Sequence, residues 1–203
     1  MSFGAGVTYL GRGGIIRRDE SGLVTGEYSF STGTAFAGAS LSILPWLRAG
    51  GSAGIAWENI DEQTGTGITA SAGLAADMGG SGTAGLAVTG LGVPPEWNGV
   101  SKAMPVEVSA ALSWKLSPSM DCFGGTTLGF STSSSFGGGL SMDLTGLRLS
   151  AGYRFSPGEE EVTGLFGGIQ YTYTSSGTYI IEAAVSQRDR MDWPVLAGIS
   201  VRL

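Results

Sequence analysis

Apolar and polar residues alternate along most of the chain. In the segment LRLSAGYRFS at residues 147–156, the odd-numbered positions hold Leu, Leu, Ala, Tyr and Phe, and the even-numbered positions hold Arg, Ser, Gly, Arg and Ser. Successive side chains of a β-strand point to opposite faces, so this segment predicts a strand with one oily face and one face that carries arginine. A strand of this kind separates two different surroundings.

The same period recurs in about twelve segments of near ten residues, each closed by turn residues. The segments run over residues 2–11, 24–30, 33–44, 47–58, 67–78, 83–93, 105–116, 121–131, 135–144, 147–156, 163–174, 178–187 and 194–203. We interpret the short 24–30 piece as an arm of a long projecting hairpin loop, which leaves twelve strands. The connections predict hairpins, because crossovers need longer links. The short connections on one side are 44–47, 79–82, 117–120 and 156–161, and the longer ones on the other side are 59–66, 93–104 and 188–193.

The two parities differ in their chemistry. One parity is apolar, whereas the other carries charges of both signs among Gly, Ser and Thr. The charged residues of the polar parity are Arg48, Glu58, Asp77, Glu107, Lys115, Asp143, Arg148, Arg154, Glu182 and Arg202. Either these side chains line a region that selects among solutes, or they pair across an interior for structural reasons.

The strand length and the sparse charge favour a membrane barrel over a soluble sandwich. A soluble sandwich has strands of about five or six residues and an outer face rich in Lys and Glu. A transmembrane β-barrel has strands of about nine to eleven residues, an apolar face toward lipid, a polar lumen and a closed sheet. The sequence therefore predicts one all-β domain over residues 1–203, a transmembrane antiparallel up-and-down β-barrel of about twelve strands in a bacterial outer membrane.

The composition excludes several kinds of chemistry. The chain has 36 Gly, one Cys and no His, and 14% of its residues are charged. The lack of His removes Ser-His and Cys-His catalysis, and the single Cys122 removes an internal disulfide and any multi-cysteine metal site. We therefore expect no catalytic residues, no cofactor and no metal. The net charge of -6 argues against a nucleic-acid partner, which clustered Lys and Arg would bind.

Tryptophans fall at or near the ends of the expected strands. Aromatic side chains in these places are typical of the girdles that a membrane barrel carries at its two interfaces, and ordinary packing is the alternative. The tryptophans are Trp46, Trp57, Trp97, Trp114 and Trp193. The acidic run at residues 159–161 could bind a divalent cation or a basic partner, or form a solvated loop tip.

Three stretches resemble one family of membrane proteins. They are FGAGVTYLGRGGIIRRDESGLVTGEYSFS at 3–31, LRLSAGYRFSPGEEEVTGLFGGIQYTY at 147–173, and the closing PVLAGISVRL at 194–203. In them the chain is similar to the PorV/PorQ group of outer-membrane barrels, relatives of the FadL fatty-acid transporters. The resemblance implies a fourteen-stranded barrel with an amino-terminal hatch in its lumen, and a role in uptake of hydrophobic compounds or as an accessory protein in secretion. The hatch and the first two strands have no counterpart before Met1, so we expect either a fragment or a shortened member that closes on twelve strands.

These features together predict a membrane barrel that passes or takes up hydrophobic or small solutes, or that assists secretion. The expected partners are the lipid bilayer, the barrel-assembly machinery, and hydrophobic small molecules or secretion-system proteins. The alternative is a structural or surface-assembly β protein without transport activity, because Gly- and Ser-rich strands with exposed edges can add to one another.

Overall fold

The structure is a computed structural model that describes residues 1–61, 63–97, 100–101, 104–130, 134–157, 163–187 and 195–202. Every regular element within these residues is a β-strand. The strands are β1 Ser2–Arg18, β2 Val24–Leu44, β3 Leu47–Ile60, β4 Gln63–Asp77, β5 Gly82–Trp97, β6 Val100–Ser101, β7 Glu107–Ser117, β8 Met120–Gly129, β9 Ser135–Leu144, β10 Leu147–Phe155, β11 Gly164–Thr174, β12 Thr178–Ser186 and β13 Val195–Arg202. The described residues contain no helix that is long and apolar enough to cross a membrane.

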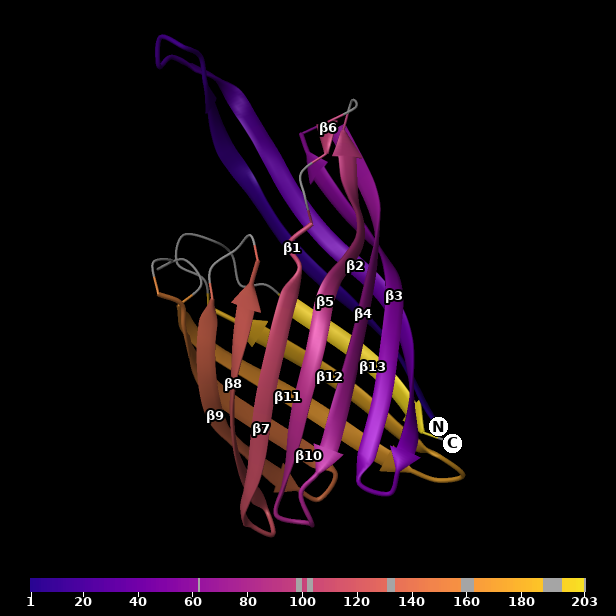
Figure 1. Ribbon diagram of the computed structural model, residues 1–203. Helices are drawn as coiled ribbons and strands as arrows, with labels where there is room; N and C mark the ends of the chain where they lie inside the picture. Colours follow the sequence, from indigo (N-terminus) through magenta and orange to yellow (C-terminus); the bar gives the residue numbers. More distant parts are fainter. Residues whose placement is uncertain are drawn as a thin grey trace.

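The sheet closes on itself into a barrel (Figure 1). Strand β1 pairs with both β2 and β13, and the further pairings of the ring join successive strands in an antiparallel manner, with β5 pairing to β7 past β6. Only β6 stands outside the ring, as a piece of 2 residues that pairs with the end of β5. The predicted antiparallel up-and-down barrel of about twelve strands is therefore confirmed. Closure leaves each strand of the ring with a partner on both sides, which a sheet in hydrocarbon requires.

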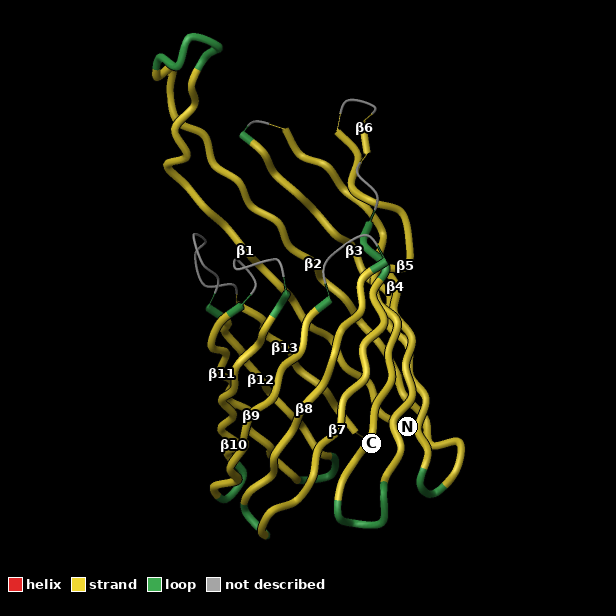
Figure 2. Tube along the Cα trace, turned by 60° about the vertical axis from the view of Figure 1, so that its left-hand side comes forward, coloured by secondary structure: helices red, strands yellow, loops and turns green. Residues whose placement is uncertain are grey.

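The two ends of the barrel differ. The tight turns lie at one end, beside both termini, and the other end carries the longer connections (Figure 2). At the β9–β10 turn, Thr145 and Gly146 have φ of 45° and 89°, which is the left-handed pair that a two-residue hairpin needs. The connection at 156–161 was predicted for the tight-turn end, and this is wrong. Strand β10 starts at the tight turn after β9 and runs away from it, so the β10–β11 connection lies at the opposite end.

The β1–β2 hairpin projects beyond the rest of the wall (Figure 1). The expected arm at 24–30 and the expected strand at 33–44 are one continuous strand, β2, although the arm does extend past the barrel as predicted. The expected gap between them, at residues 31–32, lies within this strand. In the structure Gly33 is an ordinary strand position under the Trp57 ring, where a Cβ atom would come to 2.3 Å from Trp57 Cζ2. Gly33 therefore makes room for a ring.

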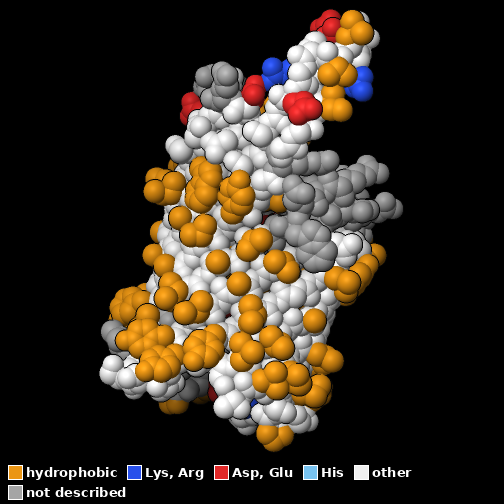
Figure 3. Space-filling model, turned by 180° about the vertical axis from the view of Figure 1, so that it is seen from behind, with side chains coloured by type: hydrophobic (Ala, Val, Ile, Leu, Met, Phe, Trp, Pro, Cys, Tyr) orange, Lys and Arg blue, Asp and Glu red, His pale blue; other side chains and the backbone are white. Residues whose placement is uncertain are grey.

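The apolar side chains cover the outside of the molecule. No hydrophobic side chain among the described residues is buried, and Ile55 and Ile68, which are partners across β3 and β4, are each 60% exposed. Figure 3 shows such side chains spread over the outer wall, with most of the acidic and basic groups of that face at the end that carries the projecting hairpin. A soluble protein would have the opposite arrangement, so the outer wall is suited to lipid.

Candidate functional site: the lumen

The inner wall is lined mostly by small side chains, which leave connected hollows. Three of these have volumes of 420, 480 and 420 Å³, and Phe166 lines all three. A fourth hollow, of 540 Å³, adjoins the first at Gly85, Ser109 and Ala111 and reaches Arg48 near the tight-turn end. The hollows therefore follow one another along the inside of the barrel.

Two phenylalanine rings meet on the inner wall. The ring centroids of Phe123 and Phe166 are 5.9 Å apart, and their planes are inclined by 45°. Each ring lies over a glycine of a neighbouring strand: a Cβ atom on Gly139 would be 2.8 Å from Phe123 Cζ, and one on Gly152 would be 2.4 Å from Phe166 Cζ. The glycines therefore let the rings lie flat against the wall. Sequence reasoning missed both rings, although an aromatic residue on the Gly- and Ser-rich parity was the available signal.

Arg148 is held by a polar cluster at the tight-turn end of the lumen. Its guanidinium forms an ion pair with Asp121, donates to Ser141 Oγ at 2.7 Å, and lies 3.9 Å from Asp143 Oδ2. The Asp121 side chain is only 12% exposed, so this pair is partly shielded from solvent. The two predicted residues Arg148 and Asp143 are thus brought together, and Asp121 was missed although it opens a strand on the polar parity.

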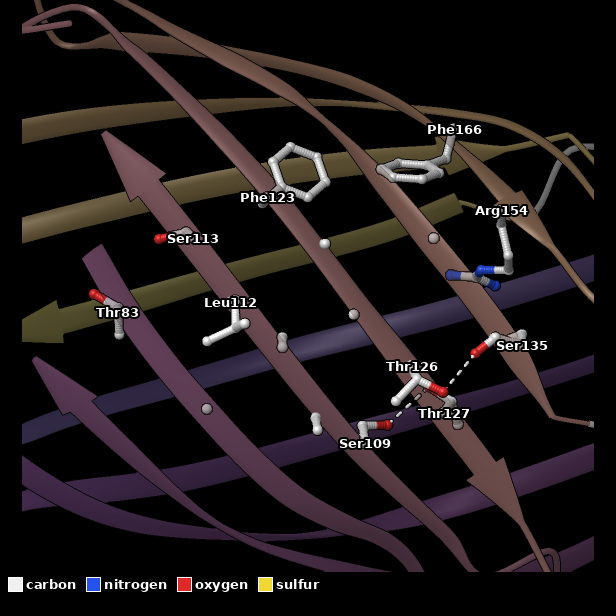
Figure 4. Close-up of a pocket in the computed structure, with 16 residues that line it drawn as sticks. Thr83, Ser109, Leu112, Ser113, Phe123, Thr126, Thr127, Ser135, Arg154 and Phe166 are labelled. Atoms are coloured by element: carbon white, nitrogen blue, oxygen red, sulfur yellow. Dashed lines mark hydrogen bonds between the residues drawn. The ribbon is translucent and has the colours of Figure 1, made fainter. Parts of the chain in front are cut away.

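Arg154 lies on the same strand and the same face as Arg148, but in different surroundings. Among the residues that the structure describes, no ion pair or hydrogen bond of its side chain is found. Arg154 and Phe166 are the two residues that line both the 420 Å³ hollow and the 480 Å³ hollow. Figure 4 shows the Arg154 side chain directed into the first of these, between the Phe166 ring and Ser135. Its guanidinium is therefore available to a solute.

The other predicted lumen charges are spread over both ends. Arg48, Asp77, Lys115 and Glu182 are exposed on the inner parity of their strands, and Asp77 Oδ1 accepts hydrogen bonds from the turn amides of residues 79 and 80 at 3.0 and 3.2 Å. At the opposite end, Glu107 begins β7 and Glu58 lies two positions before the end of β3. The side chain of Arg202 lies outside the described part of the chain, as do residues 159–161.

Most of the predicted girdle residues lie on the outside. Trp46 and Trp114 are 54% and 50% exposed near the tight turns, and Trp57 lies on the outer parity of β3. Trp97 differs from the prediction: its ring lies over Gly65 on the face that carries Glu58, and its indole nitrogen donates to the Glu58 carbonyl at 3.4 Å. The register shifts of β5 turn this face inward. Trp193 lies outside the described residues.

The outer aromatic residues of β10 and β11 indicate the height of the apolar wall. Because Leu147 pairs with Tyr171, Tyr173 is level with residue 145, ten positions before Phe155. Ten positions correspond to about 33 Å of strand, or about 25 Å of height at a tilt of about 40°. This agrees with the apolar band of about 25 Å that outer-membrane barrels present to lipid.

The projecting hairpin ends in a hydrogen-bonded turn. Asp19 Oδ1 accepts from the amides of Ser21 and Leu23 at 2.9 Å each and from Ser21 Oγ at 2.6 Å. These bonds, first the one from the Ser21 hydroxyl, hold the pKa of Asp19 below its usual value of 3.8. Among the described residues no three His, Cys, Asp or Glu side chains gather as metal ligands. The hydrogen bonds of Asp19 therefore stabilise the turn.

Comparison with known proteins places the fold. No protein-family model matches the sequence, and no curated protein sequence matches it. The toluene transporter TbuX of Ralstonia pickettii is 12% identical, with a TM-score of 0.62 over 98% of this chain and 88% of TbuX. The toluene transporter TodX of Pseudomonas putida is 9% identical, with a TM-score of 0.62 over 98% of this chain and 87% of TodX. The KdgM porin is 6% identical, with a TM-score of 0.56 over 98% of this chain and 99% of the porin. At such identities the likeness concerns the fold alone: this chain has the fold of an outer-membrane β-barrel.

Proposed function

We propose that the protein is a passive channel of the bacterial outer membrane that admits small solutes with an apolar part. The observation that carries this proposal is the series of hollows that meet at Phe166 inside a closed wall. Volumes of this size accommodate ligands of the size of a single ring or a short sugar. The solute names of TbuX, TodX and KdgM belong to those proteins, and they support here only the general role of a channel.

The lining chemistry favours solutes that are neither highly charged nor wholly apolar. Hydroxyl groups such as Ser109 and Thr127, whose oxygens are 2.9 Å apart, alternate with glycines and with the Phe123 and Phe166 rings. Charges lie mainly toward the two ends, where they act on entry and exit. We assign the inner-parity charges to this selective role and the outer tryptophans to the membrane interfaces.

We also propose that the chain is a member of the PorV/PorQ group, because of the three stretches quoted above. The projecting hairpin favours the accessory role in secretion that this placement carries, because Ile16, Leu23 and Val24 are more than half exposed on it. Co-purification of secretion-system proteins with the intact chain, and their loss after deletion of residues 12–28, would test this second function.

Swelling of proteoliposomes tests the channel directly. We expect vesicles that contain the folded barrel to swell faster than empty vesicles in arabinose or benzamide. Two neighbouring glycines give a matched pair of variants: Gly168 has the inner parity and Gly167 the outer parity. Gly168→Trp should at least halve the rate, because the ring enters the lumen, and Gly167→Trp should leave it unchanged. Equal rates for empty and loaded vesicles, with a folded barrel, would refute the proposal.

A further inference from the structure

We infer that Arg154 and the rings of Phe123 and Phe166 form a binding site inside the channel for small aromatic monocarboxylates. The inference rests on the proposed function, because it names the class of solute that the same lumen holds. It is carried by a contrast between two arginines of one strand together with the shape of the hollow around one of them.

The contrast concerns the partners of the two guanidinium groups. Arg148 is neutralised by Asp121, with Asp143 nearby and Ser141 as a further acceptor. Six positions further along β10, the structure describes no acceptor at the Arg154 side chain, which is partly exposed to the lumen. A guanidinium stays protonated at any ordinary pH and presents a planar fork that matches a carboxylate. Arg154 is thus the group of the inner wall best suited to hold an anion.

The surroundings of Arg154 supply a place for an aromatic ring. Phe166 lines both hollows that Arg154 lines, and Phe123 joins it in the first one (Figure 4). Aromatic rings prefer tilted or offset contacts at centroid distances of about 4.5 to 7 Å, as this pair has at 5.9 Å, and both rings line the first hollow, where a third ring can contact them. The hollow of 420 Å³ has room for a ring whose carboxylate reaches the guanidinium.

The polar groups of the same hollow narrow the class of anion. Ser109, Thr127 and Ser135 line it with hydroxyl groups, which can donate to a carboxylate oxygen but carry no charge. A phosphate or a dicarboxylate carries more negative charge and would need a second cation to balance it. Among the described residues, Arg154 is the only cationic side chain that lines this hollow. The chain as a whole has a net charge of -6, so an anion without a local cation would be disfavoured. One guanidinium beside two rings therefore selects a monoanion with a ring.

Equilibrium binding to the folded barrel in detergent tests the site without requiring transport. Benzoate is the probe, benzamide is its neutral counterpart of the same shape, and acetate is the anion without a ring. We expect benzoate to bind at least tenfold more tightly than either, by calorimetric titration. Arg154→Met should weaken benzoate binding at least tenfold and change the affinity for benzamide by less than twofold. Arg154→Lys should retain part of the benzoate binding, because lysine keeps the positive charge but lacks the planar guanidinium that binds both carboxylate oxygens.

The ring part of the site has its own variant. Phe166→Ala should weaken both benzoate and benzamide, while the outer-wall change Leu165→Ala should affect neither. Unchanged benzoate binding in Arg154→Met, or equal binding of benzoate and benzamide by the unaltered protein, would overturn the inference. If vesicles swell in benzamide but the titration shows no preference for benzoate over benzamide, the channel is supported and the binding site is refuted. Benzoate binding without any swelling would keep the site and remove the channel.

Discussion

The two faces of β10 can be tested with two adjacent residues. Leu149 lies on the outer parity between its partners Met142 and Ile169 and is 38% exposed, whereas Ser150 lies on the inner parity and lines a hollow of 420 Å³. Leu149→Arg therefore places a charge in lipid, and Ser150→Arg places the same charge in the lumen. The same side chain at neighbouring positions makes each variant the control of the other.

The size of the effect follows from the depth of each residue. Leu149 is one position from the middle of the apolar wall, which on this strand runs from the level of residue 145 to Phe155. An arginine that faces lipid at mid-depth costs about 2 to 4 kcal/mol, so the folding equilibrium should fall roughly 100-fold for the middle of that range. For Ser150→Arg the main cost is repulsion from Arg148, about 7 Å away along the strand. This amounts to about 0.6 kcal/mol in water, and the acidic partners of Arg148 reduce it further.

Denaturant titration of the barrel folded in lipid vesicles measures both variants. We expect the free energy of unfolding to fall by about 3 kcal/mol in Leu149→Arg and by less than about 1 kcal/mol in Ser150→Arg. Equal losses of unfolding free energy would mean that both side chains face the same surroundings. A larger loss in Ser150→Arg would place the arginine-bearing parity on the outside, and either result would refute the barrel and favour the soluble surface assembly.

Two further predictions concern the inner wall. In a double-mutant cycle, Asp121→Leu and Arg148→Met should show a coupling free energy of about 1 to 2 kcal/mol, which lies between the values for exposed and fully buried ion pairs. A coupling near zero would mean that the ion pair is freely solvated. Gly152→Ala should destabilise the barrel by about 1 to 3 kcal/mol, because its Cβ would come within 2.4 Å of Phe166 Cζ and 2.5 Å of the Gly138 oxygen. Gly167→Ala is the control, since its Cβ would have no neighbour closer than 3.6 Å; equal stability of the two variants would contradict the close approach of Phe166 to the wall.

Much of the fold could be predicted because alternation is a local property. Each strand of a barrel meets lipid on one face and the lumen on the other, so the parity of residues 147–155 alone indicates which face is which. Short turns between successive segments then leave an up-and-down order as the simple solution. The boundary error at 31–32 has a physical cause: Ser and Thr next to a glycine are common in turns, although here they continue a strand in which Gly33 makes room for the Trp57 ring.

Which side chains meet in the lumen was decided by the tertiary structure, because these residues come from strands that are far apart in the sequence. The sequence determined that Arg148 and Arg154 share a face, but it could not show which of them meets an acid. Only the register across β8, β9 and β10 brings Asp121 to Arg148. Likewise, Phe123 and Phe166 share the inner face of the sheet, and only the curvature of the sheet from β8 to β11 brings their ring centroids to 5.9 Å from each other. Periodicity along one strand determines which face a side chain takes, whereas its neighbours across the barrel depend on register and curvature, which no single segment encodes.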